Sequence, residues 1–275
     1  MPNQKRAGGA TINLLQFTDC HLMKHADGEL LGVNTRESLS AVTQLAKSNI
    51  ESGIHKNPDL ILATGDLAQD GSPEAYRYFK EHIDEFSCPV SWFPGNHDDL
   101  SAMEEVVGSG KELAKVVKIG AWQFVLLNSL VPGSVHGFLE KNELSTLEAA
   151  LKENPQLHTM VCFHHHPVDV DSVWMDKIGL HNRDELFEIV NRYANVRALV
   201  WGHIHQELDD EIGDLAIMAT PSTCVQFLPE SDDFAVDSSV PGYRWFSLHP
   251  NGTIDTGVIR ALDYEFELDL ASNGY

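Results

Sequence analysis

Carboxylate, amide and imidazole side chains gather in five short runs that are widely separated along this sequence. Cys20 is the one cysteine within these runs, and no second cysteine lies near it at a metal-binding spacing. The expected donor atoms are therefore oxygen and imidazole nitrogen. That mixture suits Mn, Fe or Zn ions at a hydrolytic site. The runs are Asp19-Cys20-His21, Gly65-Asp66, Gly95-Asn96-His97-Asp98, His164-His165-His166 and Gly202-His203-Ile204-His205.

Each run by itself also has an ordinary structural explanation. FPGNHDD (93–99) is rich in turn residues, so Asn96, His97 and Asp98 would equally well form the exposed tip of a turn. A single Asp-x-His or Gly-Asp is common in proteins that bind no metal. The two-residue spacing in 19–21 and in 203–205 does place both side chains of each pair on one side of an extended segment. Cys20 is therefore expected to point away from them.

The five runs each follow a short apolar segment that is typical of a strand buried on both faces. Open α/β sheets bind ligands at the carboxyl ends of their strands, so this placement predicts that the five runs meet at one site. The predicted strands are residues 11–17, 59–64, 89–93, 159–163 and 196–201.

Amphipathic segments between these strands predict helices that cover the sheet or sheets. Ser72 is expected to cap one of them, with Pro73 at its first position, and Gly53 is expected to end another. The predicted helices are residues 35–53, 72–86, 142–153 and 182–194. After Gly202 the pattern predicts strands at 214–220, 243–248 and 253–262, the last two joined by a turn at 249–252.

The gross composition fits one large α/β domain over residues 1–275, because 43% of the 275 residues are hydrophobic. With 19 basic and 41 acidic residues, the net charge of -22 argues against nucleic-acid and anionic-membrane partners. Bound cations would still allow an anionic substrate. No stretch resembles a signal peptide or a membrane span. The four cysteines show no paired spacing, so we expect a reduced, cytoplasmic protein.

The order D-x-H, G-D, G-N-H-D, H, G-H-x-H resembles that of the calcineurin-like metallophosphoesterase superfamily. LLGVNTRES, ATGDLAQDGS, CFHHHP, GHIHQELD, ATPSTCVQFLPESDDF and PGYRWF are similar to segments of bacterial class III 3′,5′-cyclic-AMP phosphodiesterases. The resemblance implies an α/β fold, a four-layered α-β-β-α sandwich of two mixed sheets flanked by helices. Protein phosphatases carry an arginine after the Gly-Asp motif, which is missing here. Gln69 occupies the position of the purple acid phosphatase tyrosine.

The same resemblance implies two divalent or mixed-valence transition-metal ions per chain, with Fe and Mn favoured and Zn as an alternative. Asp66 would bridge them. His164 is preferred to His165 and His166 because the family ligand is the first polar residue after the strand. The first ion would be held by Asp19, His21 and His205, and the second by Asn96, His164 and His203.

By resemblance, a metal-bound hydroxide would open 3′,5′-cyclic AMP to 5′-AMP and so lower cellular cyclic AMP. His97 would be the catalytic residue that donates a proton to the departing O3′, a task that suits imidazole. Either Asp70 or Asp98 would orient it. The substrate-binding residues implied are His21, Asn96, His97 and His205.

The substrate loops are expected at residues 168–182 and 221–230, which follow two of the ligand runs. Trp174 and Phe227 would form an apolar wall for the nucleoside, and simple packing is the alternative for each. Other diesters or pyrophosphates, or a protein-binding scaffold without metals, are the alternative functions. The expected partner is a small cyclic nucleotide, and a homodimer is compatible with the sequence. Candidate hydrogen-bonding residues are His181, Asn182, Ser222 and Thr223.

Overall fold

Two mixed β-sheets lie face to face in the computed structural model, which describes residues 9–108, 110–269 and 274. The first sheet has the order β15-β14-β1-β4-β5. Strands β1, β4 and β5 are parallel to one another, and β14 is antiparallel to both of its neighbours, β1 and β15. Its strands are β1 (Ile12–Phe17), β4 (Leu60–Ala63), β5 (Val90–Trp92), β14 (Gly242–Leu248) and β15 (Ile254–Arg260).

The second sheet has the order β10-β11-β9-β8-β7-β6, with the four inner strands parallel and the two edge strands antiparallel. Two short two-stranded pairs lie outside both sheets, β2 (Glu29–Leu30) with β3 (Val33–Asn34) and β12 (Gln226–Phe227) with β13 (Val236–Asp237). The second sheet contains β6 (Val116–Ile119), β7 (Trp122–Leu126), β8 (His158–Cys162), β9 (Val196–Trp201), β10 (Leu208–Ile212) and β11 (Leu215–Ala219).

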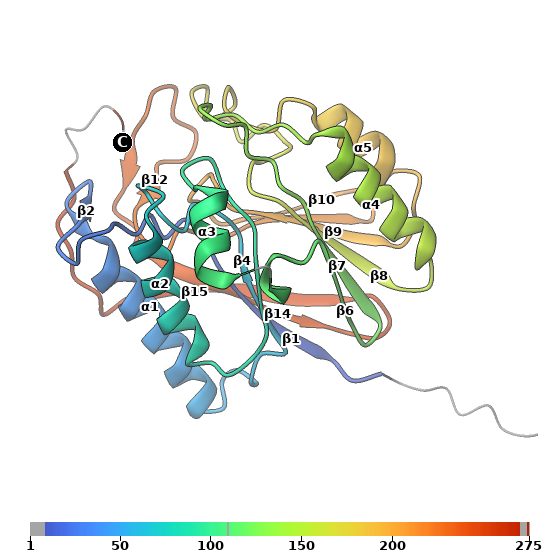
Figure 1. The fold of residues 1–275 in the computed structure, drawn as a ribbon, viewed down its shortest axis with the longest axis horizontal. Coiled ribbons are helices and arrows are strands. Elements are labelled where there is room, and N and C mark those ends of the chain that lie inside the picture. Colours follow the sequence, from blue (N-terminus) through green and yellow to red (C-terminus); the bar gives the residue numbers. More distant parts are fainter. Residues whose placement is uncertain (1–8, 109, 270–273, 275) are drawn as a thin grey trace, which may run out of the picture.

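Helices cover the outer faces of both sheets, as Figure 1 shows. Asn34 caps α1 by accepting hydrogen bonds from two backbone amides of its first turn, and Ser72 caps α2, which has Pro73 in its first turn. The helices are α1 (Thr35–Glu51), α2 (Pro73–Asp84), α3 (Leu100–Val107), α4 (Lys141–Glu153) and α5 (Arg183–Val190), with a 3-10 turn η1 (Lys111–Leu113). Within the described residues, no helix is both long and apolar enough to cross a bilayer.

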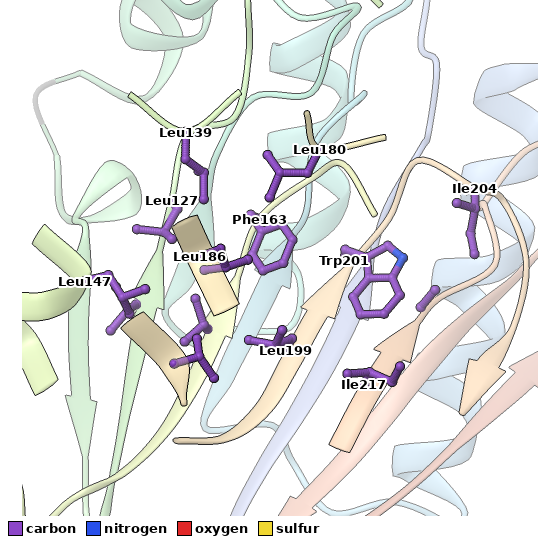
Figure 2. Packing of buried hydrophobic residues seen from close by; sticks show 14 of the residues in the cluster. Leu127, Leu139, Leu147, Phe163, Leu180, Leu186, Leu199, Trp201, Ile204 and Ile217 are labelled. Atoms are coloured by element: carbon purple, nitrogen blue, oxygen red, sulfur yellow. The ribbon is translucent and has the colours of Figure 1, made fainter. Parts of the chain in front are cut away.

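Three layers of apolar side chains fill the spaces between these four layers of secondary structure. In β4, Leu62 joins the core between the sheets, while Ile61 faces the helices α1 and α2. In β9, Val200 faces the other sheet and Leu199 faces α4 and α5 (Figure 2). Successive strand residues point to opposite faces. Both faces are covered here, so these strands read as continuous apolar runs, and the four-layered α-β-β-α sandwich is confirmed.

A buried polar network joins the two sheets between their apolar residues. Gln16 of β1 donates from its amide to Thr64 Oγ1 at 2.9 Å and to the Trp201 carbonyl at 3.1 Å, and it accepts from Thr220 Oγ1 at 2.6 Å. Arg244 of β14 is fully buried and donates to Thr220 and to the Asp209 carboxylate. Because every one of these groups has a partner, the network fixes the relative position of the sheets at the ends that carry the polar loops.

Most predicted elements are present, with ends that shift by a few residues. Gly53 follows the end of α1 with φ +78°, a conformation that glycine adopts without strain. Among the strands of the two sheets and the α-helices, four elements were not predicted, namely β6, β7, β10 and α3, and the short strands β2, β3, β12 and β13 and the turn η1 were not predicted either. Strand β10 reads as polar because four of its five residues are exposed at the edge of the sheet.

Candidate metal centre

The five polar runs converge at the carboxyl ends of β1, β4, β5, β8 and β9, which belong to both sheets. Backbone hydrogen bonds join the first two loops, since Asp19 N donates to Gly65 O at 3.0 Å and His21 N donates to Asp66 O at 2.9 Å. The amide of His203 donates to both oxygens of the Asp19 carboxylate at 3.0 Å, which connects the first sheet to the second. The predicted meeting of these loops is therefore present.

The side chains of the cluster face one another across a buried space. His164 Nε2 lies 3.1 Å from Asp66 Oδ2, and His205 Nε2 lies 3.4 Å from Asp19 Oδ1. His21 Nε2 lies 3.0 Å from His205 Nε2 and 4.0 Å from Asp66 Oδ2. Four groups of described residues have ligand atoms within 4.8 Å of one another, namely Asp19, His21 and His205; Asp19, Asp66 and His164; His164, His165 and His203; and His21, Asp66 and His97.

Each of the four histidines proposed as ligands has its outer nitrogen next to an oxygen of the protein. His21 Nδ1 lies 2.6 Å from the Gln69 amide oxygen, and His164 Nδ1 lies 2.9 Å from the Thr64 carbonyl. His203 Nε2 lies 3.1 Å from the Ile178 carbonyl, and His205 Nδ1 lies 2.8 Å from the Val225 carbonyl. An N–H that donates to each oxygen leaves the other ring nitrogen unprotonated and directed into the cluster. Metal-binding histidines have this arrangement.

Several buried polar atoms of the cluster have no hydrogen-bond partner. Such atoms cost free energy when they are left unsatisfied, so they indicate a missing polar ligand. The His21 and His205 nitrogens, 3.0 Å apart, would also bring two lone pairs together unless a proton or cation lies near them. The residues present fit transition-metal ions on both counts. The unpartnered atoms are Asn96 Oδ1, His165 Nε2 and His203 Nδ1, whereas Asp66 Oδ2 and His164 Nε2 lie 3.1 Å from each other.

The backbone is strained at the residues that carry these donors. Non-glycine residues seldom adopt positive φ, and such outliers gather at functional sites. Here the left-handed residues lie in the loops that follow β1, β4 and β9, so the backbone turns sharply where it leaves each of these strands. Their φ values are 52° for Asp19, 47° for His21, 50° for Asp66, 67° for His203 and 51° for His205.

The glycines of the motifs leave room for the cluster. A Cβ atom added to Gly95 would lie 2.2 Å from Asp66 Oδ1, and one added to Gly202 would lie 2.5 Å from Asp19 Oδ2. At Gly65, which has φ +92°, a Cβ atom would lie 2.5 Å from His164 Nδ1. The three glycines are therefore required by close approach of backbone to the carboxylates and the imidazole.

The corner formed by Asn96 and His97 places two neighbouring side chains in different surroundings. Asn96 Oδ1 is buried without a partner, whereas the His97 ring is half-buried with its centroid 5.0 Å from that of His21. The His97 backbone amide donates to Asp66 Oδ1 at 2.8 Å, which holds the corner against the cluster. A ring nitrogen of His97 also lies within 4.8 Å of ligand atoms of His21 and Asp66, so His97 faces the cluster from its half-buried position.

Asp98 stabilises this corner through hydrogen bonds to its carboxylate. It accepts hydrogen bonds from the amides of Ala68 and Gly95 at 3.0 and 2.9 Å and from the Tyr76 hydroxyl at 3.0 Å. Asp70 accepts from the amides of Lys24 and Ser72 and lies at the surface. These contacts give both carboxylates structural roles, and an orienting contact with the His97 ring remains a hypothesis from the sequence.

The electrostatics of the cluster follow from its burial. Burial lowers the pKa of His21 to about 3, with a further lowering by His205. Burial also opposes protonation of His164, but the Asp66 carboxylate outweighs it and raises the pKa of His164 to about 9. The pKa of Asp98 is raised to about 7 by burial and by the nearby charge of Asp66. The Asp66 carboxylate thus supplies negative charge to the cluster and stabilises a positive charge placed beside it.

The proposed substrate loops mainly support the cluster. Ser222 donates to the Asp19 carbonyl at 2.6 Å, and Asn182 bonds to both backbone groups of Leu139. Phe227 and Thr223 are fully buried. His181 is exposed and stacks on His136 with ring centroids 3.8 Å apart, and half-buried Trp174 packs edge-to-face on Phe227 and Phe234. Sequence reasoning missed Gln69 and Val225, whose oxygens lie next to ligand histidines.

A sandwich of two mixed sheets between helices, with a buried carboxylate, amide and imidazole cluster at one end, is the arrangement of a metallophosphoesterase. The family model for calcineurin-like phosphoesterases matches residues 12–207, and the chain belongs to this family.

Similar proteins extend this match to nearly the whole chain. The 3′,5′-cyclic adenosine monophosphate phosphodiesterase CpdA of Escherichia coli K12 is 44% identical over 98% of this chain and 97% of its own length. The CpdA protein of Pseudomonas aeruginosa is 42% identical over the same shares. A 3′,5′-cyclic-nucleotide phosphodiesterase of Nostoc is 36% identical over 90% of this chain and 92% of its own length.

Solved structures share the fold at low sequence identity. A dimetal phosphatase from Danio rerio aligns with a TM-score of 0.62 and 14% identity, covering 91% of this chain and 99% of its own. GAP50, the anchor in the inner membrane complex of Plasmodium, aligns with the same TM-score at 12% identity, covering 93% and 86%. These two likenesses concern the fold alone.

Proposed function

We propose that this chain is a dinuclear-metal phosphodiesterase that hydrolyses 3′,5′-cyclic AMP to 5′-AMP and thereby lowers cellular cyclic AMP. The observation that carries the proposal is the 44% identity over 98% of the chain to a relative named as a cyclic-AMP phosphodiesterase. The cluster of buried oxygen and imidazole donors at the strand ends supports it, because bound cations would allow an anionic phosphodiester to approach a protein that carries a net charge of -22.

In this proposal Asp66 bridges two ions. Its Oδ2 atom lies 3.1 Å from His164 Nε2 on one side and 4.0 Å from His21 Nε2 on the other. The ligands of the first ion are Asp19, His21 and His205, and those of the second are Asn96, His164 and His203. We propose Fe and Mn as the ions, with Zn as the alternative, since all three accept imidazole and oxygen ligands.

Two ions held in this way would activate water and stabilise charge on the phosphate oxygens. The chain itself orients the reaction. His97, half-buried beside His21, is placed to give its proton to the ribose O3′ as the bond from phosphorus to O3′ breaks and water oxygen joins the phosphorus from the opposite side. Asn96, His21 and His205 line the same space and would hold the phosphate in line with His97. The product keeps its phosphate on the 5′ oxygen.

The wider setting follows from the same assignment. We propose that residues 1–275 act as one domain in the cytoplasm, where four free cysteines remain reduced. The partner we expect is the small cyclic nucleotide. Nucleic acid and membrane are not expected partners because of the net charge of -22, and a homodimer stays compatible with this proposal.

The test is a substrate panel on purified protein whose metal content has been measured. Cyclic AMP should be converted to 5′-AMP, which should accumulate, and a generic aryl phosphodiester should be cleaved less efficiently. Chelation should abolish both activities, and added Mn or Fe should restore them. Turnover of a nucleotide pyrophosphate or another diester, without turnover of cyclic AMP, would assign the centre to a different substrate of the same family.

A further inference from the structure

His165 is a buried histidine that the proposed ligand set does not use. Its side chain has no exposed surface, and its ring centroid lies 5.0 Å from that of His164 and 4.6 Å from that of His203. One ring nitrogen from each of these three histidines lies within 4.8 Å of the others. The middle residue of the triple histidine therefore faces the same space as its two neighbours in the cluster.

The surroundings of His165 match those of the four proposed ligand histidines. Its outer nitrogen, Nδ1, lies 2.8 Å from Ser129 Oγ, in the loop that follows β7. Its other nitrogen, Nε2, is buried and has no hydrogen-bond partner. A hydroxyl can donate or accept, so Ser129 permits an Nδ1–H donor with an unprotonated Nε2 directed inward, and an unpartnered Nε2 in this position is costly without a cation.

The loop that covers His165 keeps it against the cluster. A Cβ atom on Gly137 would lie 2.4 Å from His165 Cγ, so only glycine permits this contact. Gly137 is held in turn by backbone hydrogen bonds, from its amide to the Gly179 carbonyl at 3.1 Å and from the His181 amide to its own carbonyl at 2.9 Å. The ring is therefore fixed between this loop and the histidines of the cluster.

The next residue, His166, provides the contrast. It is also buried, at 2% exposure, and it stacks on His203 with ring centroids 5.5 Å apart. Neither of its ring nitrogens makes a hydrogen bond of good geometry, although the backbone of Met175 lies close to the ring. It belongs to none of the groups of ligand atoms found among the described residues. Burial and position in the run thus do not by themselves distinguish His165, whereas its geometry does.

We propose that His165 is a further imidazole ligand, through Nε2, of the ion that His164 and His203 hold. The inference rests on the dinuclear centre proposed above. It makes the two ion positions chemically different, because Asp19 supplies a terminal carboxylate to one position and a third imidazole is added to the other. Imidazole suits Fe and Zn, whereas carboxylate suits Mn, so His165 would favour Fe or Zn at the second position.

The first test is a measurement on the unmutated protein. Substitution with paramagnetic Co²⁺ shifts the proton resonances of imidazole N–H groups on bound ligands far from their usual range. The four histidines of the ligand set each contribute one exchangeable signal, and the proposal predicts one more from His165 Nδ1–H. A spectrum with signals from the four alone would overturn the proposal, and this result does not depend on any variant folding or on any substrate.

The second test compares two replacements. Asn at position 165 keeps a polar atom near Ser129 but has none at the Nε2 position, whereas Gln can reach that position. His165→Asn should weaken binding of the second ion by about 10- to 100-fold in chelator competition, as for other contacts that support a metal site. His165→Gln should recover part of that loss. Equal affinity of His165→Asn and wild-type protein for both ions would also overturn the proposal.

His166→Asn is the matched comparison, because it changes the adjacent buried histidine, which stacks on His203 but belongs to none of the groups of ligand atoms. It should keep the extra Co²⁺ signal and weaken binding of the second ion less than His165→Asn does. These readouts are independent of catalysis. A protein that binds both ions and shows the extra signal, yet does not cleave cyclic AMP, would disprove the proposed substrate while leaving the role of His165 intact.

Discussion

The ring of Phe227 lies flat on the ring of His205, with centroids 4.0 Å apart and planes 10° apart. The carbonyl of Val225, two residues earlier, lies 2.8 Å from His205 Nδ1. One short segment at β12 therefore holds both the face and the outer edge of a proposed ligand. Phe227 is fully buried, so it packs behind the proposed ligand His205 and does not form an exposed wall for a nucleoside.

Asp66 is expected to be the most damaging single replacement in the cluster. Asp66→Asn removes the charge between the two proposed ion positions, so both ions should be lost, whereas His205→Ala should empty mainly the first. Elemental analysis after gel filtration measures this difference. Retention of one full equivalent of metal by Asp66→Asn would show that Asp66 does not bridge the ions.

His97 should be needed for turnover but not for metal binding. Its ring is half-buried beside the cluster, and its backbone amide donates to Asp66 Oδ1. His97→Ala should lower kcat by about 10²- to 10⁴-fold, the usual effect of losing a general acid, with both ions retained. Metal content and kcat measured on the same sample check this prediction.

A suitable control for His97 is His25→Ala, because His25 is exposed. His55 also lies outside the motifs, but it is a poorer control because its ring packs against Tyr243 and Trp245. Loss of an ion in His97→Ala, with both ions kept in His25→Ala, would mean that His97 is a ligand and that its proposed role is wrong.

The sequence predicts this centre well because its motifs are local and lie at strand ends. Asp19 and His21 can be found from their spacing, and the order of all five runs leads to the family. The sequence predicts less about the supporting residues. Gln69 and Ser222 hold His21 and Asp19 through contacts across the chain, and no local pattern distinguishes them from ordinary polar residues.

The unpredicted elements have similar physical causes. Residues of β10 are polar because they form an exposed edge, so the alternation typical of a half-buried strand is absent. The two-residue spacing at Asp19 and His21 suggested an extended segment, but both residues have positive φ, which a sequence pattern does not indicate for non-glycine residues. The side chains of Asp19 and His21 still converge, but a tight turn brings them together and not an extended backbone.

Gln69 should set the metal affinity at the first ion position. Its amide oxygen lies 2.6 Å from His21 Nδ1, so Gln69→Leu removes the acceptor that orients this ring. We expect about 10- to 100-fold weaker binding of the first ion, measured by chelator competition, with the second ion little affected. Gln69→Glu keeps an acceptor oxygen and should retain most of the affinity. Equal binding by the Leu variant would show that His21 is oriented by other contacts.

Tyr76 should stabilise the fold through Asp98. Its buried hydroxyl donates to Asp98 Oδ1 at 3.0 Å and accepts from the Asp99 amide at 2.9 Å. Tyr76→Phe removes both hydrogen bonds, leaving the Asp99 amide without this acceptor while Asp98 Oδ1 keeps the Ala68 amide, so the free energy of unfolding should fall by about 1–3 kcal/mol. Denaturant titration measures the change. Tyr78→Phe, at a half-buried tyrosine with one longer hydrogen bond, should cost less.

Trp174 separates two explanations of the loop that follows the triple histidine. Its ring packs edge-to-face on Phe227 and on Phe234, with both centroid distances 5.2 Å. Because Phe227 backs His205, Trp174→Ala should loosen a proposed ligand of the first ion. We therefore expect kcat/KM to fall by a similar factor for cyclic AMP and for a small aryl phosphodiester, together with weaker metal binding. Trp174→Phe keeps an aromatic ring against Phe227 and should recover most of both activities. A loss confined to cyclic AMP, with metal affinity unchanged, would instead place Trp174 in contact with the base or ribose of the substrate.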